Sequence, residues 1–164
     1  MANVVPQLDF MQALKLSTSR LKDMTGRSRR SEFWWTILAV GVLNIILSFI
    51  PVVGKFLVII LWIATCPLMI RRMHDVGKGP GIVYAYLILY VLMTVFGLIT
   101  YFAAKNLALG LAGTFGLLST IVGIGALVCG IILIVFAVQD SQGNNQFGPS
   151  PKYPDGKPEI PAQQ

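Results

Sequence analysis

The sequence predicts an all-α, polytopic membrane protein with four transmembrane helices and a short amphipathic helix near the N-terminus. Of the 164 residues, 55% are hydrophobic and only 12% are charged. Soluble domains carry about 25% charged residues, so too little polar material remains here for a separate soluble domain. The apolar residues also gather into long runs separated by short polar segments. We therefore expect residues 1–152 to form a single membrane domain.

The amphipathic helix is expected between Leu8 and Met24. Its apolar stripe falls at alternating spacings of four and three and consists of Phe10, Leu14, Ser17, Leu21 and Met24. Two placements fit this stripe equally well. The helix lies in the membrane interface, or it packs on the rest of the protein.

The four spanning helices are expected at residues 33–50, 53–70, 82–102 and 115–138. The second is short for a hydrocarbon core about 30 Å thick, and Pro67 is expected to kink its last turn. The segment 107–114 fits either a loop or an early start of the fourth span. Within that span Gly116, Gly123 and Gly130 recur every seven residues. Such a stripe of small residues lets another helix approach closely.

The polar end of the chain is expected to lack helices. Residues 139–152 are rich in Asn, Gly and Pro, which predicts turns, and residues 153–164 are expected to form a disordered tail. Cys66 and Cys129 lie inside apolar runs, which favours buried thiols over a disulfide. No basic segment leads into an apolar run at the N-terminus, so the first span is expected to act as its own insertion signal.

The distribution of charge predicts the topology. Eleven of the 13 Lys and Arg residues fall in the N-terminal segment, the loop at 71–81 and the C-terminal segment. The opposite side carries only Lys55 and Lys105. By the positive-inside rule both termini are expected in the cytoplasm. All seven acidic residues and the one histidine fall on the same side, so we expect the functional chemistry there.

Three polar motifs, at residues 26–35, 71–81 and 139–152, are expected to converge on this cytoplasmic face. Charges held close to hydrocarbon should be paired, and Glu32, Asp75 and Asp140 are the candidate partners of the arginines. The candidate site comprises Arg27, Arg29, Arg30, Glu32, Trp34, Arg71, Arg72, His74, Asp75, Gly77, Asp140 and Asn145.

The same motifs carry a family likeness. Gly-Arg-Ser-Arg-Arg-Ser-Glu-Phe-Trp-Trp at 26–35, Arg-Arg-Met-His-Asp-Val-Gly at 71–77 and Asp-Ser-x-Gly-x-Asn-x-Phe-Gly-x-x-Pro at 140–151 resemble the domain of unknown function 805 family. Its members are small bacterial inner-membrane proteins, and the likeness covers about residues 10–152. Members commonly have a Ser-Gly-Trp-Trp run after the second motif, where this chain has Lys-Gly-Pro-Gly-Ile. The resemblance implies location and fold, and it brings no established activity.

The sequence argues against an enzyme. A single histidine excludes a multi-histidine metal site within one copy, and adjacent residues such as His74 and Asp75 do not face the same way on a regular element. No motif supports a nucleophile at Ser28, Ser31 or Ser141. We therefore expect no catalytic residue, no metal and no cofactor.

The arginines leave two interpretations open. They set topology and anchor the protein to headgroups, or Arg27, Arg29, Arg71 and Arg72 grip a lipid phosphate or an acidic protein segment. We expect a non-enzymatic interaction or anionic-lipid-headgroup-binding protein in the bacterial inner membrane. A protein partner or homo-oligomer fits this expectation, whereas nucleic acid does not.

The alternative is a small transporter or channel component. Ion-coupled transport by one copy needs charged groups deep in the membrane, and none lies deep in any span. Asn44 is nearly the only strongly polar residue in the first two spans, and it is expected to face another helix.

Overall fold

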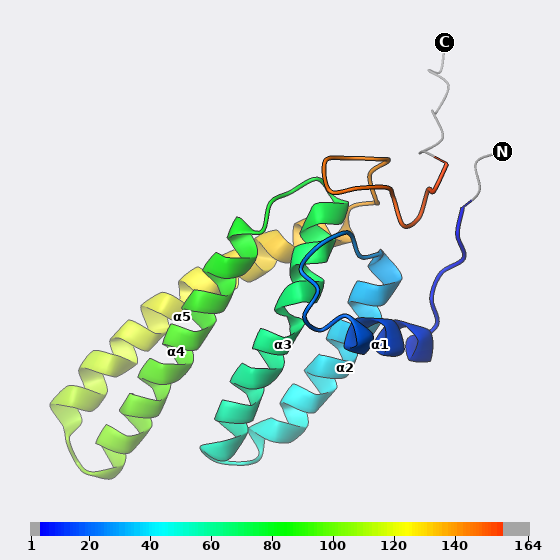
Figure 1. Ribbon diagram of the computed structural model, residues 1–164. Helices are drawn as coiled ribbons and strands as arrows, with labels where there is room; N and C mark the ends of the chain where they lie inside the picture. The colour runs from blue at the N-terminus through cyan, green and yellow to red at the C-terminus, as the bar shows by residue number, and fades with distance from the viewer. Residues whose placement is uncertain (1–3, 156–164) are drawn as a thin grey trace. The chain divides into compact units, whose positions relative to one another are not determined.

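The computed structural model describes residues 4–155 of the chain. They form five α-helices: α1 (Phe10–Ser19), α2 (Arg30–Ser48), α3 (Val53–Asp75), α4 (Gly81–Lys105) and α5 (Leu109–Val138) (Figure 1). Four of these, α2 to α5, are long and apolar enough to cross a membrane. The all-α, multi-pass prediction is therefore confirmed. The expected tail lies outside the described residues from residue 156 onward.

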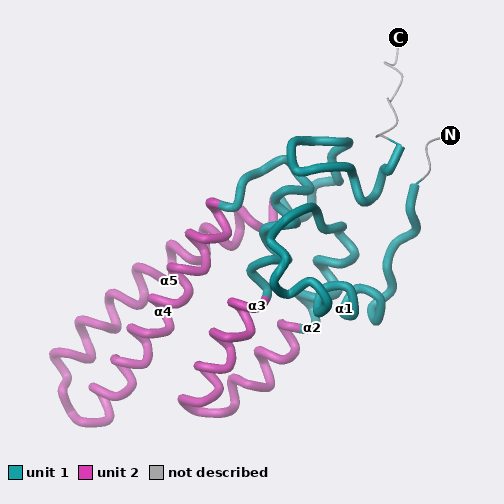
Figure 2. Tube along the Cα trace, in the orientation of Figure 1, with its two compact units in different colours: residues 1–39, 65–80, 136–164 teal, residues 40–64, 81–135 magenta. Residues whose placement is uncertain are grey.

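The helices contribute to two compact units, coloured separately in Figure 2. Unit 1 comprises residues 1–39, 65–80 and 136–164, and unit 2 comprises residues 40–64 and 81–135. Every acidic residue of the sequence falls within unit 1. The only charged residues of unit 2 are Lys55 and Lys105. The two units therefore differ sharply in the polar chemistry that they offer.

Helix α1 is shorter than its apolar stripe suggested. A capping box begins it, in which the Asp9 carboxylate accepts a hydrogen bond from the Gln12 backbone N–H at 2.7 Å. It ends at Ser19 because Asp23 binds the Arg20 guanidinium and the Thr25 N–H, which stabilises a turn instead of another helical turn. Leu21 and Met24, which the stripe included, lie beyond the helix and are exposed.

Helix α1 packs on α2 within unit 1. The rings of Phe10 and Trp35 meet edge to face with their centroids 5.7 Å apart. On the same helix Ala13 and Ser17 are buried. Of the two placements that the stripe left open, these contacts favour packing on the rest of the protein.

Helix α3 continues past the apolar run into the second motif. Arg71 to Asp75, expected in a loop, are helical, and Pro67 therefore lies inside the helix rather than in its last turn. The helix ends in a Schellman motif: Lys78 N–H donates to the Met73 carbonyl at 2.8 Å, and Gly77 N–H to the His74 carbonyl at 3.1 Å. Gly77 has a φ of +72°, which favours glycine.

Helices α4 and α5 form a close pair in unit 2. A Cβ added at Gly123 would lie 3.1 Å from the Met93 sulfur, and one added at Gly130 would lie 3.4 Å from the Tyr86 ring. The predicted stripe of small residues is thus confirmed as the face of α5 that meets α4. Helix α5 begins at Leu109, so most of the ambiguous segment 107–114 is helical.

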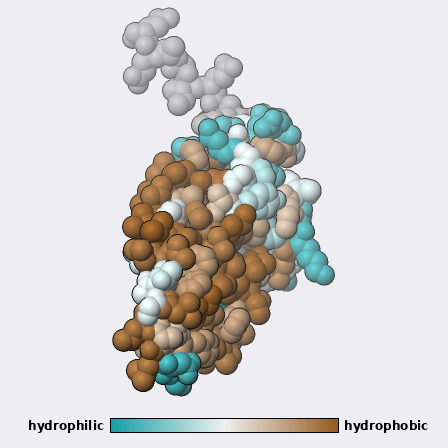
Figure 3. All heavy atoms as spheres, turned by 90° about the vertical axis from the view of Figure 1, so that its left-hand side faces the viewer, coloured by the Kyte–Doolittle hydropathy of each residue, from teal (hydrophilic) through white to brown (hydrophobic). Residues whose placement is uncertain are grey.

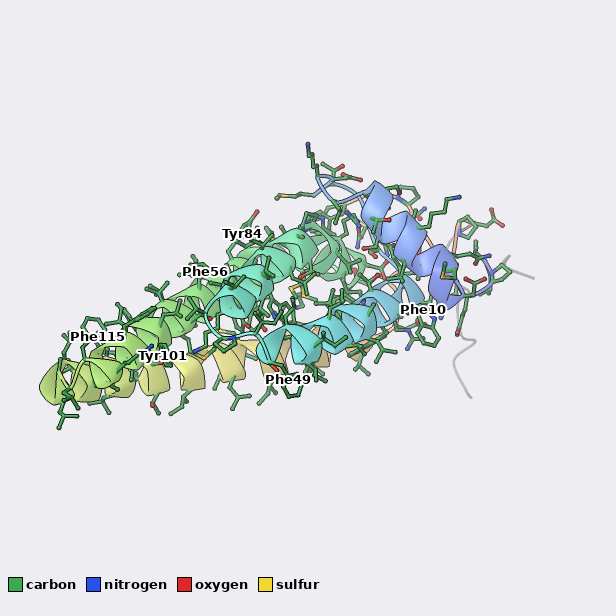
Figure 4. The ribbon with its side chains drawn as sticks, turned by 90° about the horizontal axis from the view of Figure 1, so that it is seen from below. Phe10, Phe49, Phe56, Tyr84, Tyr101 and Phe115 are labelled. Atoms are coloured by element: carbon green, nitrogen blue, oxygen red, sulfur yellow. The ribbon has the colours of Figure 1, made fainter. Side chains whose placement is uncertain are left out.

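The outer surfaces of the long helices are apolar. Hydrophobic residues cover most of the face shown in Figure 3. Figure 4 labels four of the exposed aromatic side chains of unit 2, Phe49, Phe56, Tyr84 and Tyr101. Surfaces of this composition are characteristic of helices that face lipid rather than water.

Candidate functional site

Asp75, the last residue of α3, is the centre of a buried polar network in unit 1. Its Oδ1 lies 2.9 Å from Arg27 Nη2 and accepts a hydrogen bond from Arg27 Nε at 3.0 Å. Its Oδ2 pairs with Arg72 and accepts a hydrogen bond from the Ser141 hydroxyl at 2.6 Å. The three charged side chains are at most 2% exposed. This carboxylate therefore has two cationic partners and a hydroxyl around it.

A second buried pair joins α3 to α2. Arg71 Nη2 lies 3.2 Å from Glu32 Oε1, and neither side chain is more than 2% exposed. Arg71 Nη1 also donates to the backbone carbonyls of Arg20 and Asp23, which holds the turn after α1. Within residues 4–155 the Nε of Arg71 has no hydrogen-bond partner. Arg71 therefore connects α3 to α2 and to the turn after α1 inside the protein, and it is not a surface cation.

The remaining donors of Arg27 and Arg72 hold the C-terminal segment. Arg27 donates to the carbonyls of Gln142 and Gly143, both at 2.7 Å. Arg72 donates to the carbonyl of Ala137 at 3.0 Å. Backbone carbonyls that would otherwise need water are satisfied in this way. These guanidinium groups face the protein and offer almost no surface to an external anion.

His74 lies next to this network without joining it. Its ring stacks on Phe147 with the centroids 3.9 Å apart and the planes 5° from parallel. Its Nδ1 is 3.1 Å from the Gly26 carbonyl, and the Asn145 amide donates to the His74 carbonyl at 2.9 Å. These contacts fix the imidazole by stacking and a backbone bond, not by a bond to the Asp75 carboxylate.

The open part of unit 1 is a cavity of about 430 Å³ at the start of α2. We call it the tryptophan cleft, and its lining includes Arg29, Arg30, Ser31, Trp34, Trp35 and Lys152. Both tryptophans are more than one-third exposed. Arg29 is only 8% exposed, and its Nη1 and Nη2 donate to the carbonyls of Pro6 and Val5, each at 2.6 Å.

Arg29 differs from the other arginines in its electrostatic surroundings. No carboxylate within the described residues lies at ion-pair distance from it, whereas Arg20, Arg27, Arg30, Arg71 and Arg72 each have one. Burial lowers the pKa of its guanidinium from the ordinary value, because a desolvated cation is disfavoured. A negative group placed in the cleft would relieve this cost.

Asp140 lies next to the same cleft and balances part of its positive charge. It pairs with Arg30 at 3.1 Å and with Lys152 at 2.7 Å, and it accepts a hydrogen bond from the Tyr153 hydroxyl at 2.8 Å. Burial acts to raise the pKa of Asp140, but the bonds from Lys152 and Tyr153 outweigh it and lower the pKa to about 2. Tyr153, which the sequence placed in the tail, is buried.

The candidate residues thus fall into three places of unit 1. The interior holds Arg27, Glu32, Arg71, Arg72 and Asp75. The tryptophan cleft and its rim hold Arg29, Arg30, Trp34 and Asp140. The corner at the end of α3 holds His74, Gly77 and Asn145. All three predicted acids pair with arginines.

Sequence reasoning missed several partners of these residues. Lys152 and Trp35 line the tryptophan cleft, and Ser141 binds Asp75. Lys152 is the last residue of the third polar motif and Trp35 is the last residue of the first, which is the signal that could have drawn attention to them. No group of three or more His, Cys, Asp or Glu side chains suited to a metal ion occurs in the described part of the chain.

Comparison with known proteins places the chain in a family without assigning it an activity. No curated protein and no solved structure matches it. Residues 21–149 match the family described as "Protein of unknown function (DUF805)", a range that includes the first two polar motifs and most of the third. Because this match covers most of the sequence, the chain belongs to the DUF805 family.

Proposed function

We propose that this multi-pass membrane protein binds the headgroup of an anionic phospholipid in the tryptophan cleft and performs no catalysis. The observation that carries the proposal is Arg29, a largely buried cation without a carboxylate partner among residues 4–155. Phosphate is an anion that suits a guanidinium, because its oxygens match the planar arrangement of N–H donors, and Arg29 Nη1 and Nη2 each donate one hydrogen bond to a backbone carbonyl and keep a second N–H.

The surroundings of Arg29 fit a lipid better than a soluble anion. Trp34 and Trp35 lie at the start of a membrane-spanning helix, where aromatic side chains prefer the headgroup level. Arg30 and Lys152 add positive charge that Asp140 only partly offsets. A phospholipid would place its phosphate at these cations and its acyl chains beside the apolar helices.

The buried network supports a structural rather than a catalytic role for the second motif. The Asp75 carboxylate is surrounded by Arg27, Arg72 and Ser141, so it is not free to orient His74 or accept a substrate proton. The imidazole is held by Phe147 instead. A general base needs hydrogen-bond access to the proton it removes, and this arrangement offers little.

We further propose that the membrane is the bacterial plasma membrane, with the tryptophan cleft on its cytoplasmic side. The charge asymmetry of the loops and the family likeness support this placement. The cytoplasmic leaflet is rich in anionic lipid in many membranes, which would supply the ligand.

Retained lipid tests the proposal. The protein is reconstituted with equal amounts of phosphatidylglycerol and phosphatidylcholine, purified in mild detergent, and analysed by native mass spectrometry. We expect wild type to retain phosphatidylglycerol preferentially. Arg29→Gln should reduce that preference about fivefold, since one cation near the surface contributes about 1 kcal/mol.

The matched control is Lys22→Gln, which removes an exposed cation outside the cleft and should leave the preference unchanged. Arg29→Lys keeps the charge and should retain part of the preference. Equal retention of the two lipids by folded wild type would refute the proposal.

A further inference from the structure

A second cleft lies within unit 2 and is distinct from the tryptophan cleft. It has a volume of about 360 Å³ and receives residues from four helices, α2 to α5. Its polar lining consists of Asn44, Ser48, Lys55, Tyr90, Thr94 and Ser119. We call it the lysine cleft. A cavity of this size lies in the range of small-molecule sites.

The polar groups of the lysine cleft lie at different heights along the helices. Lys55 is in the first turn of α3, Ser48 is the last residue of α2, and Tyr90 lies near the middle of α4. The sequence showed Asn44 as an isolated polar residue, but the fold places it in the same cleft as Tyr90. Polar side chains between membrane helices are energetically costly, so a group of them is a candidate functional site.

The charge in the lysine cleft has no counterion in its own unit. The sequence has no Asp or Glu within 40–64 or 81–135, the two ranges of unit 2. The described contact of the Lys55 ammonium is with the Tyr101 ring, 6.0 Å from its centroid. A ligand that completes this site therefore carries negative charge.

The hydroxyl groups define the rest of the ligand. The hydroxyls of Ser48, Thr94 and Ser119 donate to helix carbonyls at 2.6, 2.9 and 3.1 Å. Their protons are thus used, and their oxygens are left as acceptors. A ligand that meets them needs hydrogen-bond donors such as hydroxyl or amine groups.

We propose that the lysine cleft binds a small organic anion that also carries hydroxyl or amine donors, with its anionic group at Lys55. Gly97 leaves room for a ligand in the cleft, because a Cβ added there would meet only the Ser119 oxygen, at 3.7 Å. Gly54 is explained by packing alone, since an added Cβ would come within 2.0 Å of the Leu47 carbonyl oxygen. The proposal is independent of lipid binding in the tryptophan cleft.

Saturation-transfer difference NMR on the full chain in nanodiscs tests this site, because it detects weak ligands. Lactate and glycerol 3-phosphate serve as hydroxylated anions with a carboxylate or a phosphate, and glycerol serves as the uncharged control. We expect signals from at least one of the anions and none from glycerol. Comparing the two anions shows which anionic group the cleft prefers.

Lys55→Gln should weaken anion binding about tenfold, because a charge-assisted bond is lost. The matched control Lys105→Gln removes the other lysine of unit 2, which does not line the cleft, and should bind as wild type does. Gly97→Leu should fill the cleft and abolish binding.

A second readout on wild type avoids reliance on the variants. The bound anion should slow acetylation of Lys55 by a water-soluble reagent and leave the acetylation rate of Lys105 unchanged. Absence of binding by both anions, equal binding by Lys55→Gln, or equal protection of the two lysines would each overturn the proposal.

Discussion

Arg27 and Asp75 lie 48 residues apart in the sequence and form an ion pair of 2.9 Å in which neither side chain is more than 2% exposed. The same carboxylate also pairs with Arg72. These contacts connect the loop before α2 to the end of α3. Replacing both members of a buried ion pair by apolar residues often changes the stability little. Removing only one member leaves the other charge buried without a partner, which is strongly destabilising.

Removing the carboxylate should therefore destabilise unit 1 strongly. Asp75→Asn keeps the shape of the side chain but leaves Arg27 and Arg72 without their shared anion. We expect a loss of about 3–5 kcal/mol in the free energy of unfolding. Reversible denaturation followed by circular dichroism in detergent measures it, and a loss below about 1 kcal/mol would show that the network is not structural.

The end of α3 should be intolerant of a side chain at Gly77. Its backbone has a positive φ, which strains any L side chain, and an added Cβ would also displace the end of the Gln142 side chain. Gly77→Ala should lower the free energy of unfolding by about 1 kcal/mol or more. Gly79→Ala is the matched control, since nothing lies within 4 Å of its added Cβ. Equal stability of the two variants would contradict the Schellman geometry.

Asp140 should make stability depend on acid pH. Its pKa is lowered from 3.8 to about 2 in the folded protein. The contribution of Asp140 to folding stability is therefore complete above its ordinary pKa and is lost as the pH falls through the folded-state pKa. The stability difference between wild type and Asp140→Asn should be full at about pH 6 and shrink between about pH 4 and about pH 2. Unfolding measured across this range checks it, and a constant difference would contradict the assigned contacts.

The topology can be read with reporter fusions. We expect an exterior signal for fusions at Gly54 and Asn106, and a cytoplasmic signal for a fusion after Gln164, because eleven of the 13 basic residues lie in the segments assigned inside. Alkaline phosphatase and green fluorescent protein fusions report the two sides. An exterior signal after Gln164 would overturn the orientation and with it the cytoplasmic placement of the tryptophan cleft.

The sequence was sufficient for the apolar helices and for the identity of the acidic partners. Each span corresponds to an apolar run, and Glu32, Asp75 and Asp140 are the acids that pair with arginines. Helix α3 was predicted too short because an apolar-run argument stops at Arg71. Only the fold shows that this charge is paired with Glu32 and can continue the helix.

The two clefts were harder to foresee. Arg29 resembles its neighbours in sequence, and only the structure shows that it binds backbone carbonyls while Arg27 and Arg71 bind carboxylates. Ser48 and Ser119 are individually ordinary helix residues. They become a candidate site only because distant helices bring them to one cavity.

The most direct test of lipid binding is tryptophan quenching in nanodiscs. Trp62→Phe leaves Trp34 and Trp35, the two tryptophans of the tryptophan cleft, as the only reporters. Phosphatidylglycerol and phosphatidylcholine with identically brominated acyl chains are compared at equal mole fraction, so that only the headgroup differs. We expect stronger quenching by the brominated phosphatidylglycerol, and loss of this difference in Arg29→Gln. Equal quenching by the two lipids in the protein that retains Arg29 would contradict this expectation.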